Sequence, residues 1–351
     1  MRTLLVSALI LVSQAAFSQA WDASNSPYKL GKNFEAIYEK LPAEGGVIDQ
    51  RTAWPGSHWA NYVGGIAHRW SAGTPENFTY KRLSLNELRT KEQHEINQLS
   101  PAEKYDIFKG DYSYSTVKRV FSQVSPRESE WHGICHGYAP AAVHHPEPKT
   151  VTLTNKDGIT LTFYSSDVAG LMSYFYAKVA NTRATLVGKR CYADPQNANN
   201  LSNVDKCGDI NAGSFHIILG NLLGLEKKSF IVDIDRYREV WNHPVVSYTT
   251  RVYGETEPVA SSTRNTVKRI HMEAIVKYAS AIAPKFDPVI GTENAEYLDY
   301  TYEYYLDLNA KGEIIGGEWI SEHRPDFVWN QPKSAFTGSW STLNEIYAPV
   351  Q

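Results

Sequence analysis

The sequence of 351 residues lacks several features that would place it in a class at once. It has only three cysteines, and after its N-terminal segment no apolar run approaches the roughly 20 residues that a membrane-spanning helix needs. It also lacks a surplus of charge of one sign, because 35 basic and 38 acidic residues are well mixed. We therefore expect no membrane span in the mature chain and no nucleic acid as a partner.

The first 20 residues have the pattern of an export signal. Arg2 precedes an apolar stretch from Leu4 to Val12, and Ser18 and Ala20 place small residues where a signal peptidase reads the chain. We expect a secreted protein, extracellular or periplasmic, that begins near Trp21.

The three cysteines suggest one disulfide and one free thiol. Cys191 and Cys207 flank a polar segment rich in asparagine and aspartate. A bridge between them would remove roughly 3 kcal/mol of conformational entropy from the unfolded chain. Cys135 is then left unpaired, and a free thiol in an oxidising compartment is more readily explained by use than by accident.

Three segments are expected along the chain. Residues 1–20 form the signal peptide, residues 21–125 an N-terminal helical accessory or pro-region, and residues 126–351 a catalytic domain. Two capping boxes predict helix starts in the second segment, one at Ser84 with Glu87 and one at Ser100 with Glu103. No low-complexity linker and no internal repeat is evident between the segments.

The pattern after Cys135 predicts an α+β fold. A hairpin is expected at residues 151–163 and a helix after Ser166. Extended runs follow at 215–220, 230–235, 245–253 and 270–278, and a long hairpin over 298–320 ends the sheet. The predicted class is α+β with an antiparallel sheet, plus the N-terminal extension.

Cys135 is the candidate nucleophile. It lies in a glycine-bearing loop that enters a short helix of small residues, so it is expected near the start of that helix. There the helix dipole favours the reactive thiolate, and free backbone N–H groups can stabilise an oxyanion. The alternative is a buried cysteine that acts as a small hydrophobic residue.

A base and its orienting acid are expected from two apolar runs downstream. If residues 215–220 and 230–235 form a hairpin, His216 lies opposite Asp233 on one face. Cys135, His216 and Asp233 then form a catalytic triad. Asp235 shares the face, and a slip of register would choose it instead. A satisfied core histidine bonded to a structural aspartate is the alternative.

Two groups of residues could bind a metal ion, a pair of histidines beside Cys135 and a segment rich in aspartate. His132 and His136 have the spacing of the histidines in the zinc motif His-Glu-x-x-His, but Gly133 stands where the glutamate should be. We therefore expect the two histidines to line the rim of the thiol site instead. Asp194, Asp205 and Asp209 could supply oxygen ligands to calcium, but without EF-hand spacing a solvated loop is expected.

Four motifs resemble the transglutaminase elicitor family, which is best known from secreted oomycete wall proteins and also occurs in bacteria. They are residues 131–142 (WHGICHGYAPAA), 212–216 (AGSFH), 233–245 (DIDRYREVWNHPV) and 316–319 (GGEW). The third is the most specific, since it resembles the peptide through which plants sense the family. It carries His243 where the family has glutamine.

The resemblance implies a papain/transglutaminase-like cysteine enzyme core and the activity of a protein-glutamine gamma-glutamyltransferase. Cys135 would attack a glutamine carboxamide and release ammonia, and the thioester would pass its acyl group to a lysine amine, another primary amine or water. His216 would take the thiol proton, and Asp233 would hold the imidazole. Trp131, Gly133 and His136 would line the substrate site. No cofactor is required by the sequence, calcium is possible because the family is associated with it, and the metal site is unknown.

Two other functions fit the same residues. A papain-like cysteine peptidase or a glutamine deamidase would use the same triad when water outcompetes the amine. A secreted wall-binding or host-recognised protein would use the aromatic surface for binding without turnover. For the transglutaminase, the expected partners are protein substrates that bear glutamine and lysine, or small primary amines.

Overall fold

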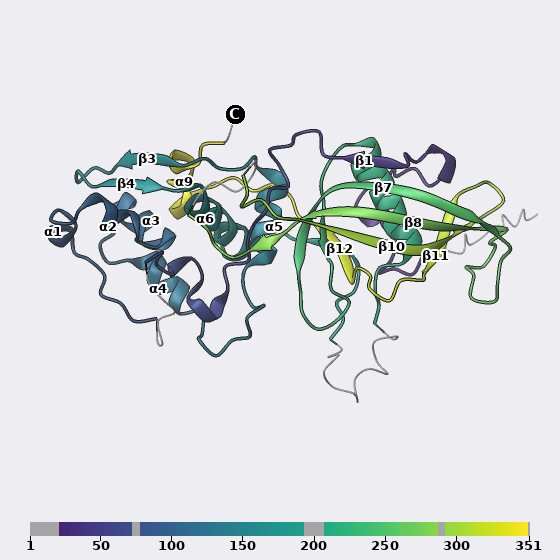
Figure 1. The fold of residues 1–351 in the computed structure, drawn as a ribbon, viewed down its shortest axis with the longest axis horizontal. Coiled ribbons are helices and arrows are strands. Elements are labelled where there is room, and N and C mark those ends of the chain that lie inside the picture. Colours follow the sequence, from purple (N-terminus) through teal and green to yellow (C-terminus); the bar gives the residue numbers. More distant parts are fainter. Residues whose placement is uncertain (1–20, 72–77, 193–206, 287–291, 350–351) are drawn as a thin grey trace, which may run out of the picture.

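The structure is a computed structural model that describes residues 21–71, 78–192, 207–286 and 292–349 (Figure 1). The predicted signal peptide, residues 1–20, lies outside this range. The α-helices are α1 (Leu85–Leu88), α2 (Gln93–Asn97), α3 (Pro101–Lys109), α4 (Ser115–Phe121), α5 (Cys135–His144), α6 (Ser165–Lys178), α8 (Ala212–Ile218) and α9 (Leu343–Ile346). Short 3-10 helices are η1 (Pro27–Lys29), η2 (Tyr38–Lys40), η3 (Asn61–Val63), η4 (Gly65–Ala67) and η6 (Gly338–Trp340), and η5 (Leu219–Leu225) is a π-helix.

The strands belong to one large sheet and two small ones. They are β1 (Glu44–Gly46), β2 (Gly56–Ser57), β3 (Val151–Thr154), β4 (Thr160–Phe163), β5 (Thr185–Gly188), β6 (Ile231–Asp233), β7 (Asn242–Thr256), β8 (Lys268–Ala279), β9 (Ala281–Ile282), β10 (Tyr297–Leu308), β11 (Ile314–Trp319) and β12 (Phe327–Asn330). The large sheet has the order β11-β10-β8-β7-β6-β12-β5, with β1 paired to β7. The predicted mixture of helices and antiparallel sheet is confirmed.

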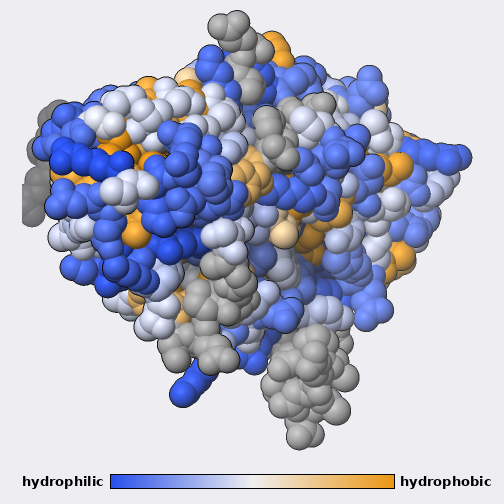
Figure 2. Space-filling model, turned by 60° about the vertical axis from the view of Figure 1, so that its left-hand side comes forward, coloured by the Kyte–Doolittle hydropathy of each residue, from blue (hydrophilic) through white to orange (hydrophobic). Residues whose placement is uncertain are grey.

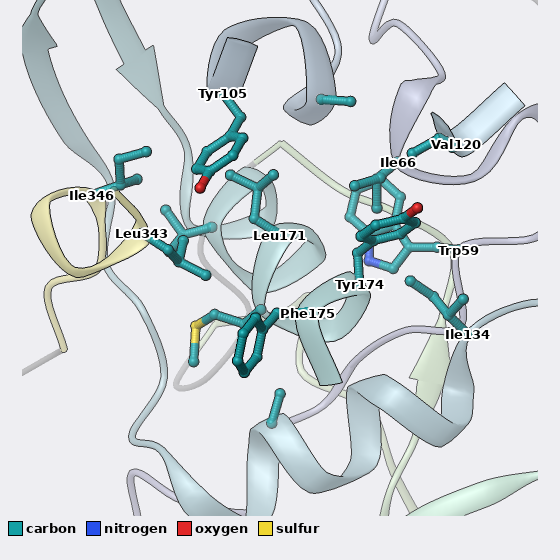
Figure 3. Packing of buried hydrophobic residues seen from close by; sticks show 14 of the residues in the cluster. Trp59, Ile66, Tyr105, Val120, Ile134, Leu171, Tyr174, Phe175, Leu343 and Ile346 are labelled. Atoms are coloured by element: carbon teal, nitrogen blue, oxygen red, sulfur yellow. The ribbon is translucent and has the colours of Figure 1, made fainter. Parts of the chain in front are cut away.

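Helix α6 is the centre of the helical part of the molecule. Leu171, Tyr174 and Phe175 point from it into a core that other helices complete (Figure 3). Tyr105 of this core comes from α3 and Leu343 comes from α9, two helices that lie far apart in the sequence. The helix is buried almost all round, as expected for a helix surrounded by other elements.

The predicted helix starts in this part are confirmed. Ser84 with Glu87 caps α1, and Ser100 with Glu103 caps α3, each through reciprocal side-chain bonds to backbone N–H groups. Gly110 ends α3 in the left-handed conformation, with φ of 75°. These signals are local, which is why the sequence predicts them well.

A second core lies between the sheet and α8, which packs against β10 and β11. Tyr302, Tyr304 and Leu306 point into it from alternate positions of β10, as the sequence pattern predicts. The predicted strand at 215–220 is wrong, because these residues form α8 and the start of η5. Asn211 begins α8 by accepting a hydrogen bond from the N–H of Gly213 at 2.9 Å.

Strand β7 connects the two parts of the molecule. Its first residues pair with β6, and from Val245 onward it pairs with β8. Figure 1 shows α5 where the helical part meets the start of this strand. Residues before position 125 contribute to both cores, Trp21 to the one beside α8 and Trp59 to the one around α6. Both cores also contain residues after position 125, so hydrophobic contacts cross the predicted domain boundary. The boundary itself stays a prediction.

Within the described ranges, no helix is both long and apolar enough to cross a membrane. The disulfide between Cys191 and Cys207 is present, as the sequence predicts. The backbone N–H of Cys191 donates to the Asp326 carboxylate at 2.6 Å, so the bridge lies beside the end of β12.

We predict that Cys191→Ser lowers the free energy of unfolding by about 3 kcal/mol, because the bridge closes a loop of 16 residues in the unfolded chain. Urea unfolding under non-reducing conditions measures this change. Cys207→Ser should give the same loss, whereas Cys135→Ser, which breaks no bridge, is the control. Equal stability of Cys191→Ser and the parent protein would contradict the prediction.

Candidate active site

The loop before Cys135 is fixed by close contact with residue 58. The N–H of Ile134 donates to the carbonyl oxygen of His58 at 2.6 Å. A Cβ atom at Gly133 would lie 2.2 Å from the same oxygen, so a side chain cannot be placed there. The close packing against His58 therefore requires a glycine at position 133. This requirement is separate from the role at the substrate site that the sequence predicts for Gly133.

Helix α5 begins at Cys135 and is held on two sides. Gly137 lies against α6 so closely that a Cβ atom would be 2.0 Å from the carbonyl oxygen of Ser173. On the other side, the hydroxyl of Tyr138 donates to the carbonyl oxygen of Trp54 at 2.8 Å. The position of the sulfur is thus set by the packing of the whole helix, as predicted for a nucleophile at a helix start.

Two groups of the segment that starts β7 contact the sulfur of Cys135. The thiol donates to the carbonyl oxygen of Val240 at 3.5 Å, and the side-chain Nδ2 of Asn242 donates to Sγ at 3.3 Å. The indole Nε1 of Trp329 in turn donates to Oδ1 of Asn242 at 2.7 Å. In the described part of the chain, no histidine side chain is hydrogen-bonded to the sulfur of Cys135.

Burial and hydrogen bonding act in opposite directions on this thiol. Cys135 is 5% exposed, and burial raises its pKa above the ordinary value. N–H groups of Asn242 and His136 lower the pKa, and the nearby Asp233 raises it. Burial is the largest effect, so the resting form of Cys135 at neutral pH is the thiol.

Cys135 lies at the wall of an open cleft of about 590 Å³. Predicted site residues Trp131, Gly133 and His136 line the same cleft. Other residues that line it are Asn61, Glu128, His132, Leu186, Arg190, Val240, Asn242, Phe327 and Trp329. Figure 2 shows a surface on which polar residues predominate, with hydrophobic residues recessed between them.

His216 is placed differently from the prediction. It lies in α8, it is buried, and its Nδ1 is 2.9 Å from the hydroxyl of Tyr304. Burial lowers the pKa of His216 to about 4, so its ring is neutral at neutral pH. The predicted hairpin with Asp233 does not exist, because β6 pairs with β7 and β12.

The sheet register also separates His216 from Cys135. Tyr304 of β10, the hydrogen-bond partner of His216, is paired with Met272 of β8. Met272 is in turn paired with Val252 of β7. Asn242, which contacts Cys135, is ten residues earlier on that strand. At the usual rise per residue this is about 30 Å along the strand, too far for direct proton transfer. The role of His216 as a base stays a prediction that no contact in the structure supports.

Of the two candidate acids, Asp233 is the one beside Cys135. It lies opposite Asn242 in the pairing of β6 with β7, and its Oδ1 accepts a hydrogen bond from the N–H of Trp241 at 2.8 Å. Burial raises the pKa of Asp233 well above its ordinary value. Asp235 instead lines a neighbouring cleft of about 570 Å³, which contains Trp241.

The cleft contains a different pair of histidine and acid. Nδ1 of His132 lies 3.7 Å from Oε2 of Glu128, which comes four residues earlier in the same loop. Asn61 donates to the same carboxylate oxygen at 2.7 Å, and its backbone N–H donates to the carbonyl oxygen of His132 at 2.8 Å. This places a histidine and a nearby carboxylate in the cleft of Cys135.

The sequence analysis missed Asn242 and Trp329, although a signal for both is present. The motif Val-Trp-Asn-x-Pro occurs twice, at residues 240–244 and 328–332, so the expectation of no internal repeat is wrong on this short scale. The first copy supplies Asn242 and the second supplies Trp329, and β6 lies between the two strands.

No metal centre is formed by the side chains that the structure describes, because they include no group of three or more His, Cys, Asp or Glu residues that could hold an ion. His132 and His136 thus have no third ligand among them. Asp194 and Asp205 of the possible calcium segment lie outside the described residues. We therefore derive no step through calcium or zinc.

We predict that Cys135 in the native protein reacts with iodoacetamide more slowly at pH 7 than a free cysteine does. The reason is its raised pKa and its burial, since only the thiolate is reactive. The rate should rise with pH and should reach half its maximum above pH 8.5, the value of an unperturbed thiol. Mass spectrometry of the alkylated peptide measures this rate, and a midpoint below pH 7 would contradict the prediction.

Comparisons with known proteins agree with the resemblance seen in the sequence. The model of the transglutaminase elicitor family matches residues 27–344. No curated protein matched the chain. Among solved structures, the chain is similar to the crystal structure of the GP42 transglutaminase from Phytophthora sojae, with a TM-score of 0.67, 20% sequence identity and coverage of 93% of this chain and 97% of that one. At this identity the likeness shows a shared fold, and the match of the family model carries the assignment: the chain belongs to the transglutaminase elicitor family.

Proposed function

We propose that the protein is a protein-glutamine gamma-glutamyltransferase with Cys135 as its nucleophile. The observation that carries the proposal is the position of this cysteine, at the first residue of a helix and at the wall of an open cleft. Membership of the transglutaminase elicitor family and the fold shared with the GP42 transglutaminase support the same chemistry.

The reaction consists of two acyl transfers. The sulfur of Cys135 bonds to the carboxamide carbon of a glutamine side chain, the carbon–nitrogen bond breaks, and the nitrogen leaves as ammonia with the proton of the thiol. The nitrogen of a lysine side chain then bonds to the thioester carbon. The carbon–sulfur bond breaks, and the proton of the amine restores the thiol. Two proteins are thereby joined by an isopeptide bond.

His132 is the cleft residue that is best placed to carry these protons. It lines the cleft of Cys135, and the carboxylate of Glu128 lies 3.7 Å from its Nδ1, close enough to stabilise the ring electrostatically when the ring takes up a proton. The same division of roles between a histidine and a carboxylate is found in triads of unrelated fold. A papain-like core, with the nucleophile on a helix that packs against an antiparallel sheet, is the architecture that we infer for the site.

The walls of the cleft favour an amine over water as the acceptor. Trp131, Val240, Phe327 and Trp329 supply apolar surface next to the sulfur. A thioester shielded by such groups is hydrolysed more slowly, and the methylene stem of a lysine gains contacts with them. We also infer that the enzyme is secreted, because its family is secreted and its disulfide requires an oxidising compartment.

Two alternatives remain open to experiment. A peptidase or deamidase would use the same nucleophile with water as the acceptor, and a wall-binding protein would not use it at all. The apolar residues of the cleft favour the transferase over the first, and the position of Cys135 in the wall of a cleft favours an enzyme over the second.

We predict that the mature protein incorporates a fluorescent primary amine into casein and that Cys135→Ala abolishes this incorporation while the protein stays folded. Gel fluorescence measures incorporation, with and without calcium, and circular dichroism checks the fold. Ammonia or new peptide termini without amine incorporation would identify a deamidase or a peptidase. Full activity of Cys135→Ala would end the proposal.

We further predict that His132→Gln lowers the rate of amine incorporation at least a hundredfold, the size of general acid–base catalysis by a histidine. His271→Gln is the matched control, because His271 forms a similar pair with Glu303, 2.6 Å away, on the surface of the sheet. His216→Gln should lower stability more than it lowers the rate of the folded protein. The opposite ranking of His132→Gln and His216→Gln would restore His216 as the base.

A further inference from the structure

The side-chain amide of Asn242 has a fixed orientation. Asn242 is 2% exposed, and each end of its amide has one partner, Sγ of Cys135 for Nδ2 and Nε1 of Trp329 for Oδ1. An indole N–H can only donate a hydrogen bond. The amide therefore cannot turn over without losing the bond to Trp329, so the NH₂ group must face the sulfur.

This orientation matters because the two forms of Cys135 need different partners. The neutral thiol donates to the carbonyl oxygen of Val240, but the thiolate has no proton to donate. The thiolate instead accepts hydrogen bonds, from Nδ2 and the backbone N–H of Asn242 and from the backbone N–H of His136 in α5. Asn242 thus favours the charged form that reacts, against the cost of its burial.

The two copies of the Val-Trp-Asn-x-Pro motif contribute different residues to the site, Asn242 from the first copy and Trp329 from the second. Strands β7 and β12 both pair with β6, and this brings the asparagine of the first copy to the tryptophan of the second. The other residues of the motif do not repeat the arrangement. Trp241 donates to the side chain of Glu239, and Asn330 accepts a bond from the N–H of Gln331.

We propose that Asn242 is a catalytic residue that stabilises the thiolate of Cys135, and that Trp329 is a positioning residue that acts through the amide of Asn242. The inference rests on the proposed function only in taking Cys135 as the reacting group. It assigns a role to two residues that lie far from the nucleophile in sequence and that meet it only in the folded sheet.

The test is the pH dependence of alkylation of Cys135 by iodoacetamide in four proteins, the parent, Asn242→Ala, Trp329→Phe and the double variant. Loss of one hydrogen bond to a charged group should slow alkylation at pH 7 about tenfold or more in Asn242→Ala and move its midpoint to higher pH. Trp329→Phe keeps an aromatic ring but lacks the N–H, and it should shift the midpoint in the same direction. In the Asn242→Ala background, Trp329→Phe should add nothing further.

Trp319→Phe is the matched control, because Nε1 of Trp319 donates to the carbonyl oxygen of Ile210 at 2.7 Å, outside the cleft of Cys135. It should leave the alkylation profile unchanged. An unchanged midpoint in Trp329→Phe would overturn the proposal, and so would an equal shift with and without Asn242. Trp329→Phe alone decides the matter if Asn242→Ala does not fold.

Amine incorporation by the same proteins separates this inference from the proposed function. A parent protein that incorporates no amine, but whose thiol shows the expected shifts, would contradict the transferase and support the role of Asn242. A parent protein that incorporates amine, with no shift in either variant, would support the transferase and overturn the role of Asn242.

Discussion

The fit of helix α5 between α6 and the start of β7 is the constraint on which the rest of the site depends. Gly137 allows the helix to touch the backbone of α6, and Gly133 allows the preceding loop to touch the backbone at His58. Because both contacts involve backbone atoms, they leave the helix almost no freedom to shift. The sulfur of Cys135 therefore meets Val240 and Asn242 at one defined place, and the cleft forms around it.

Much of the fold follows from local signals in the sequence. Capping boxes, turn glycines and the alternation of tyrosines along β10 each depend on residues close together in the chain, and each is confirmed. The apolar run at 215–220 is different, because a short run with a single polar residue, His216, fits a buried helix as well as a buried strand. Asn211 at its start is the helix signal that outweighs the β-branched residues.

The residues of the active site also differ in how far the sequence predicts them. Cys135 and the cleft residues beside it can be predicted, since the loop and the helix start are contiguous in sequence. Their partners cannot be derived from spacing alone, because Asn242 and Trp329 reach the sulfur only through the pairing of β7 and β12 with β6. The pairing of His216 with Asp233 was wrong for the same reason, as it assumed that neighbouring runs form a hairpin.

The bond from the thiol of Cys135 to the carbonyl oxygen of Val240 has a consequence for the lifetime of the protein. The thiolate attacks peroxides and the disulfides of other molecules far faster than the thiol does, and it is oxidised or captured as a result. A sulfur that keeps its proton and is 5% exposed resists both, even where the other two cysteines are oxidised to a bridge. The protein can thus store an intact nucleophile in an oxidising medium, and ionisation of the sulfur exposes it to chemical damage only while it is in use.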